Sequence, residues 1–149
     1  MKNWLKTILI LIVLGAAVGG GVAYFMFNKP HQDVIDTKPA FEFTANTLVS
    51  ELAKDTAAFN LKANGQVIQV SGPVRVVTAD NAGGATLLLE AGEYGLDDIS
   101  LQIDSAYMDG ILTLPTGKIV TIKGIYTGHQ YEDVLESWTV YMNRCVMMR

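Results

Sequence analysis

Residues 7–27 form a stretch of 21 residues without one charged side chain. Wound as an α-helix at about 1.5 Å per residue, this stretch would be about 31 Å long, close to the hydrocarbon thickness of a bilayer. Everything after Pro30 has a different, mixed composition. The sequence therefore predicts one transmembrane helix followed by a separate domain.

The charges that flank the apolar run predict its orientation. Lys2 and Lys6 precede the run, whereas only Lys29 follows it closely. Cationic side chains collect on the cytoplasmic side of a membrane, so we expect residues 1–6 in the cytoplasm. The chain is then a single-pass protein of the inner (cytoplasmic) membrane, and its C-terminal domain is periplasmic, that is, extracytoplasmic.

A cleaved secretory signal is the alternative to a permanent anchor, with residues 21–23 (GVA) as a small-residue cleavage site. The apolar core of a signal is usually shorter, about 7–15 residues, which favours an uncleaved anchor. A lipid anchor would need a cysteine just after the apolar run, but the only cysteine is Cys145.

Small residues within the run indicate how the helix could pack. Gly15 and Gly19 lie four residues apart, a spacing that lets two membrane helices approach closely. We expect the bilayer itself as one partner and a homo-oligomer through this helix as a possibility. The alternative is that membrane helices are simply rich in glycine and alanine.

The chain beyond the run divides into a linker, residues 28–40 with two prolines, and one domain, residues 41–149. From residue 30 onward there are 8 bases and 15 acids, a formal charge of 8 − 15 = −7. Nucleic-acid binding relies on Lys and Arg at the phosphates, so this charge argues against such a partner. Cys145 has no partner for an internal disulfide and reads as a small strand hydrophobe.

The domain sequence predicts mainly β structure with short helices. Thr44 can cap an amphipathic helix that ends near Asp55. A kink is expected at Gly72-Pro73, because proline cannot donate to a ladder and glycine permits a sharp bend. The predicted strands cover residues 66–79, 85–90, 99–103, 118–127 and 138–147, with a short helix in residues 105–112. This order describes a five-stranded OB-fold-like Greek-key barrel, with larger sandwiches as the alternative.

Four segments carry a resemblance to a known family: residues 28–31 (NKPH), 67–74 (VIQVSGPV), 118–128 (KIVTIKGIYTG) and 144–146 (RCV). With these segments the chain resembles the membrane-anchored tRNA-anti-like proteins of bacteria. The resemblance spans nearly the whole chain and implies an OB fold similar to that of anticodon-binding domains.

The OB fold also indicates where a ligand would bind, because its second and third strands and the nearby loops usually form the ligand face. Outward positions of the third predicted strand hold Ser100, Gln102 and Asp104, a polar and slightly acidic surface. Tyrosines suit sugar or peptide ligands, although most strand tyrosines are simply half-buried. The predicted ligand or partner face consists of Tyr94, Ser100, Gln102, Tyr107 and Tyr126.

Catalytic chemistry is not indicated. His31 lies in the linker and His129 in a turn, so neither stands beside an evident nucleophile. Asp97, Asp98, Asp104 and Asp109 do not have the spacing of a calcium loop. We therefore expect no catalytic residue, no metal and no cofactor.

These observations predict a non-catalytic, membrane-anchored interaction module that binds an envelope protein, peptide or glycan. A single-stranded nucleic-acid binder is the first alternative, and an enzyme with an unrecognised acidic site is the second. The nucleic-acid alternative requires scattered basic residues to converge into one groove: Lys62, Arg75, Lys118, Lys123 and Arg144.

Overall fold

The computed structural model describes residues 2–27 and 33–148 and divides the chain into two compact units, Met1–Gln32 and Asp33–Arg149. In the first unit, helix α1 runs from Lys2 to Phe27. The most apolar 18 residues of its segment Lys6–Phe27 have a mean hydropathy of 2.4, and a membrane span and a signal sequence both have such a length and composition. A Cβ atom placed on Gly15 or Gly19 would meet nothing, so helix association through this face stays a prediction.

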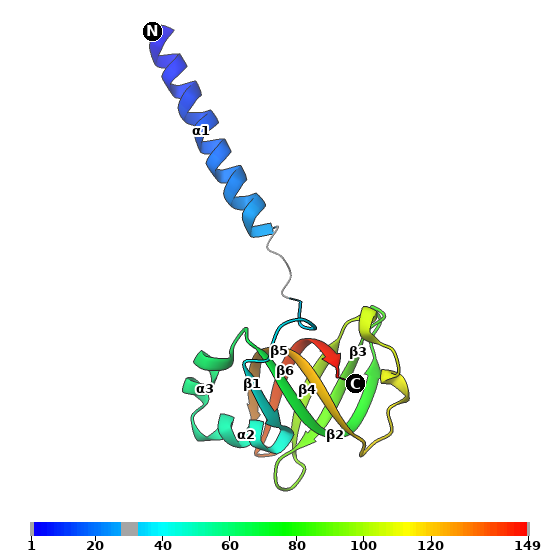
Figure 1. The fold of residues 1–149 in the computed structure, drawn as a ribbon. Coiled ribbons are helices and arrows are strands. Elements are labelled where there is room, and N and C mark those ends of the chain that lie inside the picture. The colour runs from blue at the N-terminus through cyan, green and yellow to red at the C-terminus, as the bar shows by residue number, and fades with distance from the viewer. Residues whose placement is uncertain (1, 28–32, 149) are drawn as a thin grey trace. The chain divides into compact units, whose positions relative to one another are not determined.

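The second unit is a closed barrel (Figure 1). Its strands follow the order β2-β3-β4-β6-β5, and β5 pairs again with β2. The β4–β6 pair is parallel and the other barrel pairs are antiparallel. This arrangement confirms the predicted five-stranded OB-type barrel. The strands are β2 (Val67–Ala79), β3 (Ala85–Ala91), β4 (Asp97–Ile103), β5 (Ile119–Glu132) and β6 (Ser137–Met147).

Strand β2 closes the barrel because it changes partner halfway along. Its first half, up to Pro73, pairs with β5, whereas the half from Val74 onward pairs with β3. The change coincides with the Gly72-Pro73 step, followed by a register shift between Val74 and Val76. A Cβ on Gly72 would lie 2.7 Å from Ala45 Cβ, so a helix packs where only glycine fits. The predicted kink is confirmed.

The barrel interior is filled by alternating apolar side chains. On β4, Ile99, Leu101 and Ile103 are fully buried, as the alternation in the sequence predicted. Cys145 on β6 is buried among them, and this burial raises the pKa of its thiol. Its predicted role as a strand hydrophobe agrees with that position.

Two helices cover one end of the barrel. Helix α2 (Ala45–Lys54) begins as predicted, with the Thr44 hydroxyl accepting from the Thr47 N–H at 3.2 Å. Helix α3 (Thr56–Ala63) was not predicted and is capped by Asp55, whose Oδ1 accepts from the Ala58 N–H at 2.9 Å. The predicted helix at 105–112 is instead two short 3₁₀ turns, η1 (Ser105–Tyr107) and η2 (Ile111–Thr113).

A further short strand, β1 (Phe41–Thr44), lies outside the barrel and pairs in parallel with β2. Pro39 precedes it, and the Thr44 N–H donates to Thr47 Oγ1 at 3.0 Å rather than to a neighbouring strand. Glu42, at its centre, is exposed. The residues just before this strand were predicted to form a linker, and the strand itself was not predicted.

The second half of the expected linker packs on the barrel. Residues 28–32 lie outside the described residues, but Val34 is only 5% exposed. Lys123 of β5, itself 4% exposed, donates from Nζ to the carbonyl oxygens of Ile35 at 2.6 Å and Thr37 at 3.1 Å. We call residues 33–37 and Lys123 the lysine clamp. The clamp fixes the start of the domain to the barrel wall.

Candidate ligand-binding surfaces

OB folds usually bind ligands on the outer side of their second and third strands, which are β3 and β4 here, and β6 lies beside β4. Cross-strand pairs place Leu88 beside Ser100, and Ser100 beside Tyr141. We call these outward positions the barrel face. With the flanking pairs, the barrel face consists of Thr86, Leu88, Glu90, Asp98, Ser100, Gln102, Thr139 and Tyr141.

One edge of the barrel face is held by a hydrogen-bond network. Gln102 Nε2 donates to Asp80 Oδ2 at 2.8 Å, and Thr86 Oγ1 donates to Gln102 Oε1 at 3.1 Å. Asp80 Oδ1 in turn accepts the N–H groups of Ala82 and Gly84, each at 2.8 Å. The Gln102 amide is therefore oriented by the β2–β3 loop before any ligand arrives.

The predicted tyrosines do not gather on this face. Tyr94, 82% exposed, precedes β4, whereas Tyr107 follows β4 and packs partly against the core, so they flank opposite ends of the strand. Tyr126 was wrongly predicted to face a ligand, because its side chain is fully buried. Its hydroxyl lies 2.8 Å from His129 Nδ1, and burial raises the pKa of Tyr126 to about 12. Tyr141, 39% exposed, is the tyrosine on the barrel face.

Arg75, on β2 beside the barrel face, is paired. Arg75 Nε lies 2.8 Å from Asp98 Oδ1, and its terminal nitrogen donates to the Gly95 carbonyl at 2.5 Å. Burial raises the pKa of Asp98 above its ordinary value, Arg75 opposes that rise, and the nearby Asp97 and Glu90 carboxylates add to it. The Arg75 charge is thus largely compensated by carboxylates.

Three of the five basic residues required for a nucleic-acid groove have other contacts. Lys123 is buried in the lysine clamp, Arg75 pairs with Asp98, and Lys62 Nζ lies 5.7 Å from the centre of the Phe41 ring. These three positions belong to three different elements, β5, β2 and α3. Three of the five basic residues therefore already contact other groups of the domain. The five residues named for the nucleic-acid alternative were Lys62, Arg75, Lys118, Lys123 and Arg144.

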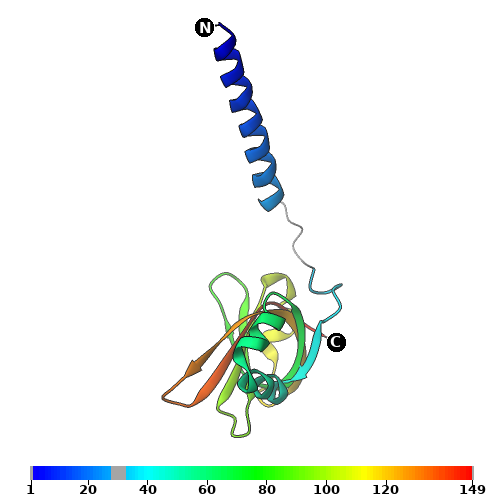
Figure 2. The same ribbon diagram turned by 90° about the vertical axis from the view of Figure 1, so that its left-hand side faces the viewer.

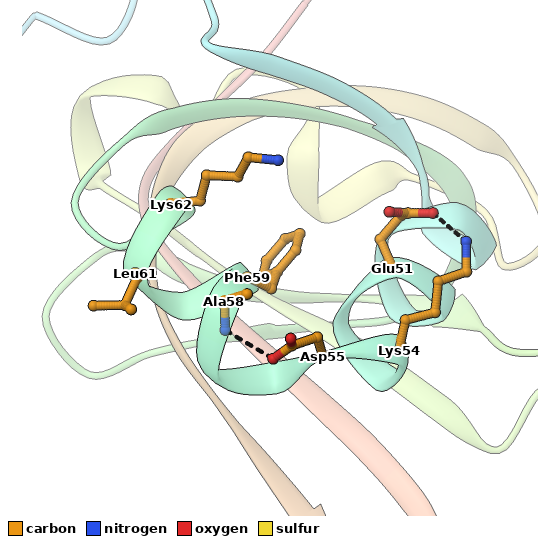
Figure 3. Close-up of a pocket in the computed structure, with 7 residues that line it drawn as sticks. All are labelled: Glu51, Lys54, Asp55, Ala58, Phe59, Leu61 and Lys62. Carbon is orange, nitrogen blue, oxygen red and sulfur yellow. Dashed lines mark hydrogen bonds and ion pairs between the residues drawn. The ribbon is translucent and has the colours of Figure 1, made fainter.

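A second surface is an open hollow of about 500 Å³ between α2 and α3 (Figure 3). Phe59 lies at its centre, and a smaller adjoining hollow of about 140 Å³ is lined by Phe41 and Phe43. The three rings follow one another at centroid distances of 6.0 Å. Sequence reasoning missed this surface because it predicted neither β1 nor α3. The available signals were the paired phenylalanines at 41 and 43 and the lone Phe59.

The charges around this hollow are balanced. Glu51 and Lys54 form an ion pair at 2.5 Å, which lowers the pKa of Glu51, while Asp55 caps α3. Lys62 stands over the Phe41 ring. The hollow therefore offers an aromatic floor and a mixed-charge rim. Within residues 2–27 and 33–148, no three His, Cys, Asp or Glu side chains form a group that could hold a metal ion.

The family model named tRNA_anti-like matches residues 1–138, nearly the whole chain. The chain belongs to the tRNA-anti-like family. No curated protein matches it. The predicted family membership is thus confirmed.

Solved structures align with this chain at low identity, and the first of them shows the same fold. A candidate nucleic acid-binding lipoprotein from Klebsiella pneumoniae aligns with a TM-score of 0.52 and 13% identity, over 81% of this chain and 100% of that chain. A candidate aspartyl-tRNA synthetase from Leishmania major aligns with a TM-score of 0.47 and 11% identity, over 88% of this chain but 26% of its own. The OBody NL8, bound to hen egg-white lysozyme, aligns with a TM-score of 0.37 and 14% identity, over 56% of this chain and 94% of that chain.

Proposed function

We propose that this tRNA-anti-like chain is a non-catalytic binding module. Helix α1 anchors it in the inner membrane, the barrel lies on the extracytoplasmic side, and the barrel face binds a protein, peptide or glycan. The observation that carries the proposal is the compensation of Arg75, the cation beside the barrel face, by carboxylates; Arg144 is the one cation on β3, β4 and β6 themselves. Arg75 is paired with Asp98, and Asp80 and Glu90 add negative charge nearby.

A single strand of nucleic acid needs a positive groove with stacking aromatic rings. The barrel face offers one half-exposed ring, Tyr141, among hydroxyl, amide, carboxylate and aliphatic side chains. Such a surface suits hydrogen bonding to a sugar or a peptide, with Leu88 as the apolar contact. The net charge of −7 on the domain also repels the phosphates of a nucleic acid.

The contacts of His129 and the burial of Cys145 support a non-catalytic role. His129 Nδ1 contacts the buried Tyr126 hydroxyl, so this nitrogen is engaged with a group of raised pKa rather than with a nucleophile. The buried Cys145 thiol also has a raised pKa, which disfavours the reactive thiolate.

Single-stranded nucleic-acid binding is the second candidate, because the Klebsiella lipoprotein of like fold is described as a candidate nucleic acid-binding protein. At 13% identity, that likeness gives the fold alone. A ligand of this kind would have to use the remaining cations, Lys118 and Arg144.

Two measurements on the full chain separate these candidates. In nanodiscs, fluorescence anisotropy with single-stranded RNA and DNA should show no binding at low salt. Binding that weakens steeply as salt rises would favour the nucleic-acid candidate and overturn the first.

A photocrosslinking amino acid at position 100 tests the barrel face in cells. We expect adducts with an envelope component from position 100 and none from position 64, where the exposed Asn64 follows α3. Equal labelling from both positions, or none from either, would contradict the proposed face. Protease protection of the barrel in spheroplasts would contradict the proposed orientation.

A further inference from the structure

Strands β5 and β6 continue together beyond the barrel as a hairpin (Figure 2). Pairing between β2 and β5 ends at Ile125, whereas pairing between β5 and β6 continues to Glu132 opposite Ser137. The β3–β4 loop lies at the same end, because β4 starts beside the start of β6, with Asp98 opposite Thr139.

A direct bond joins the hairpin to the base of that loop. The Trp138 N–H donates to Asp97 Oδ1 at 2.6 Å. The Trp138 ring lies 4.7 Å from that of Tyr131 and 5.7 Å from that of His129, so aromatic rings stiffen the base of the hairpin. The hairpin and the loop therefore form one continuous surface, which we call the hairpin end.

Large apolar side chains are unusually exposed on the hairpin end. Val134 is 85% exposed and Leu135 64% at the hairpin tip, and Tyr131 is 43% exposed below it. On the adjoining loop, Tyr94 is 82% and Leu96 57% exposed. Exposed apolar side chains that gather on one surface, with polar residues around them, mark interaction sites.

The charge of the hairpin end is of one sign. The sequence has no Lys or Arg between Arg75 and Lys118, and none between Lys123 and Arg144. The basic residue nearest this surface, Arg75, is paired with Asp98. Carboxylates are interspersed with the apolar residues: Glu93 on the loop and Glu132, Asp133 and Glu136 on the hairpin.

We propose that the hairpin end docks a partner protein through a segment in which lysine or arginine alternates with aromatic or aliphatic residues. Carboxylates around exposed apolar groups complement such a segment and repel phosphates, whether of nucleic acid or of anionic lipid. This inference rests on the interaction-module function proposed above, names the chemistry of its partner, and uses a surface other than the barrel face.

The test uses the full chain in nanodiscs of uncharged lipid and measures anisotropy of labelled peptides. The probes are a peptide that alternates lysine with tryptophan and leucine, its counterpart with glutamate for lysine, and an oligolysine of equal length. The alternating cationic peptide should bind, its affinity should fall with salt, and each of the other two should bind at least about tenfold more weakly, or about 1.4 kcal/mol.

Two variants locate the site on the hairpin tip, which lies beyond the barrel core. One replaces the three hairpin carboxylates with amides (Glu132→Gln, Asp133→Asn, Glu136→Gln), and the other replaces the tip apolar residues (Val134→Ser, Leu135→Ser). Each should weaken binding about tenfold. The matched controls Glu51→Gln and Leu61→Ser, exposed on α2 and α3, should bind as the wild type does.

Equal binding of the glutamate peptide, unchanged binding by either hairpin variant, or no peptide binding would overturn the inference. Binding to vesicles of phosphatidylglycerol or to a neutral oligosaccharide with loss in the hairpin variants would replace the proposed partner by a lipid or a glycan. Crosslinking from position 100 is independent of these peptides. If the peptides fail to bind but position 100 still crosslinks, only the inference about the hairpin end fails. If both tests fail, the proposed binding function fails as well.

Discussion

Replacing Lys123 with methionine removes the charged end of the lysine clamp and keeps most of the apolar stem. In the structure, Nζ donates to two carbonyl oxygens, those of Ile35 and Thr37. A hydrogen bond to a charged group contributes about 1.5–3 kcal/mol, so the gross loss is about 3–6 kcal/mol. The loss is reduced because the variant buries no charge and because the freed carbonyls can reach water.

We therefore expect Lys123→Met to lower the free energy of unfolding by about 2 kcal/mol, which for a domain of this size is a fall in Tm of about 8 °C. Circular dichroism of the full chain in detergent measures the Tm, and hydrogen exchange measures opening of residues 33–37. The matched control is Lys118→Met, because Lys118 is exposed just before β5. A Tm within about 2 °C of the wild type, with unchanged exchange at residues 33–37, would refute the clamp.

Three further outcomes follow from buried and half-buried groups. Gly124→Ala should lower the free energy of unfolding by about 2 kcal/mol, measured by thermal denaturation, because the new Cβ would lie 2.5 Å from Cys145 Sγ. Adding Cys145→Ala should restore part of that loss, and additive effects of the two substitutions would contradict the contact. Tyr126→Phe should lower the free energy of unfolding by about 1 kcal/mol, because the hydrogen bond with His129 is lost. Absorbance titration of the wild type should show one tyrosine that ionises near pH 12. Ionisation of every tyrosine near pH 10 would disprove the burial of Tyr126. The pKa of Asp98 is raised, so the folded state holds the carboxyl proton more tightly than the unfolded state does, and the stability that Asp98 contributes falls as the pH rises from 3.8 through the raised pKa. Asp98→Asn should remove this slope from a plot of unfolding free energy against pH, measured by urea denaturation. Identical plots for the variant and the wild type would contradict the prediction.

Periodic patterns made the barrel predictable. Alternation at Ile99, Leu101 and Ile103 identified a half-buried strand, and the Gly72-Pro73 step located the kink where β2 changes partner. The Thr44 cap located the start of α2. Each of these signals is local, so it can be read without the partner strands.

The missed elements lack such local patterns. Helix α3 buries only Phe59 and Ala63, too few residues for an apolar stripe at helical spacing. Strand β1 has four residues directly after the segment around Pro39, too short for alternation to stand out. Together they form the hollow between the helices, which for this reason had no counterpart in the sequence analysis.

The errors at the candidate site arise from long-range pairing. Strand β5 has register shifts on both sides of Tyr126, and these shifts decide which side chains enter the core. Lys123 is buried by carbonyls 86 and 88 residues earlier in the chain. Neither the register shifts nor the burial of Lys123 can be predicted from the neighbouring residues in the sequence.

Closure of the sheet through the second β2–β5 pairing affects how copies behave when they are concentrated. A tether of the proposed kind would confine many copies to a two-dimensional layer, where a long free strand edge would invite sheet extension from one molecule to the next. Two short strand segments remain at the margin. One is the four-residue β1, with the charged Glu42 at its centre and the Thr44 N–H already satisfied. The other is the end of the β5–β6 hairpin beyond Ile125, which carries Glu132. Crowding on a membrane would then favour side-chain recognition over polymerisation through backbone hydrogen bonds.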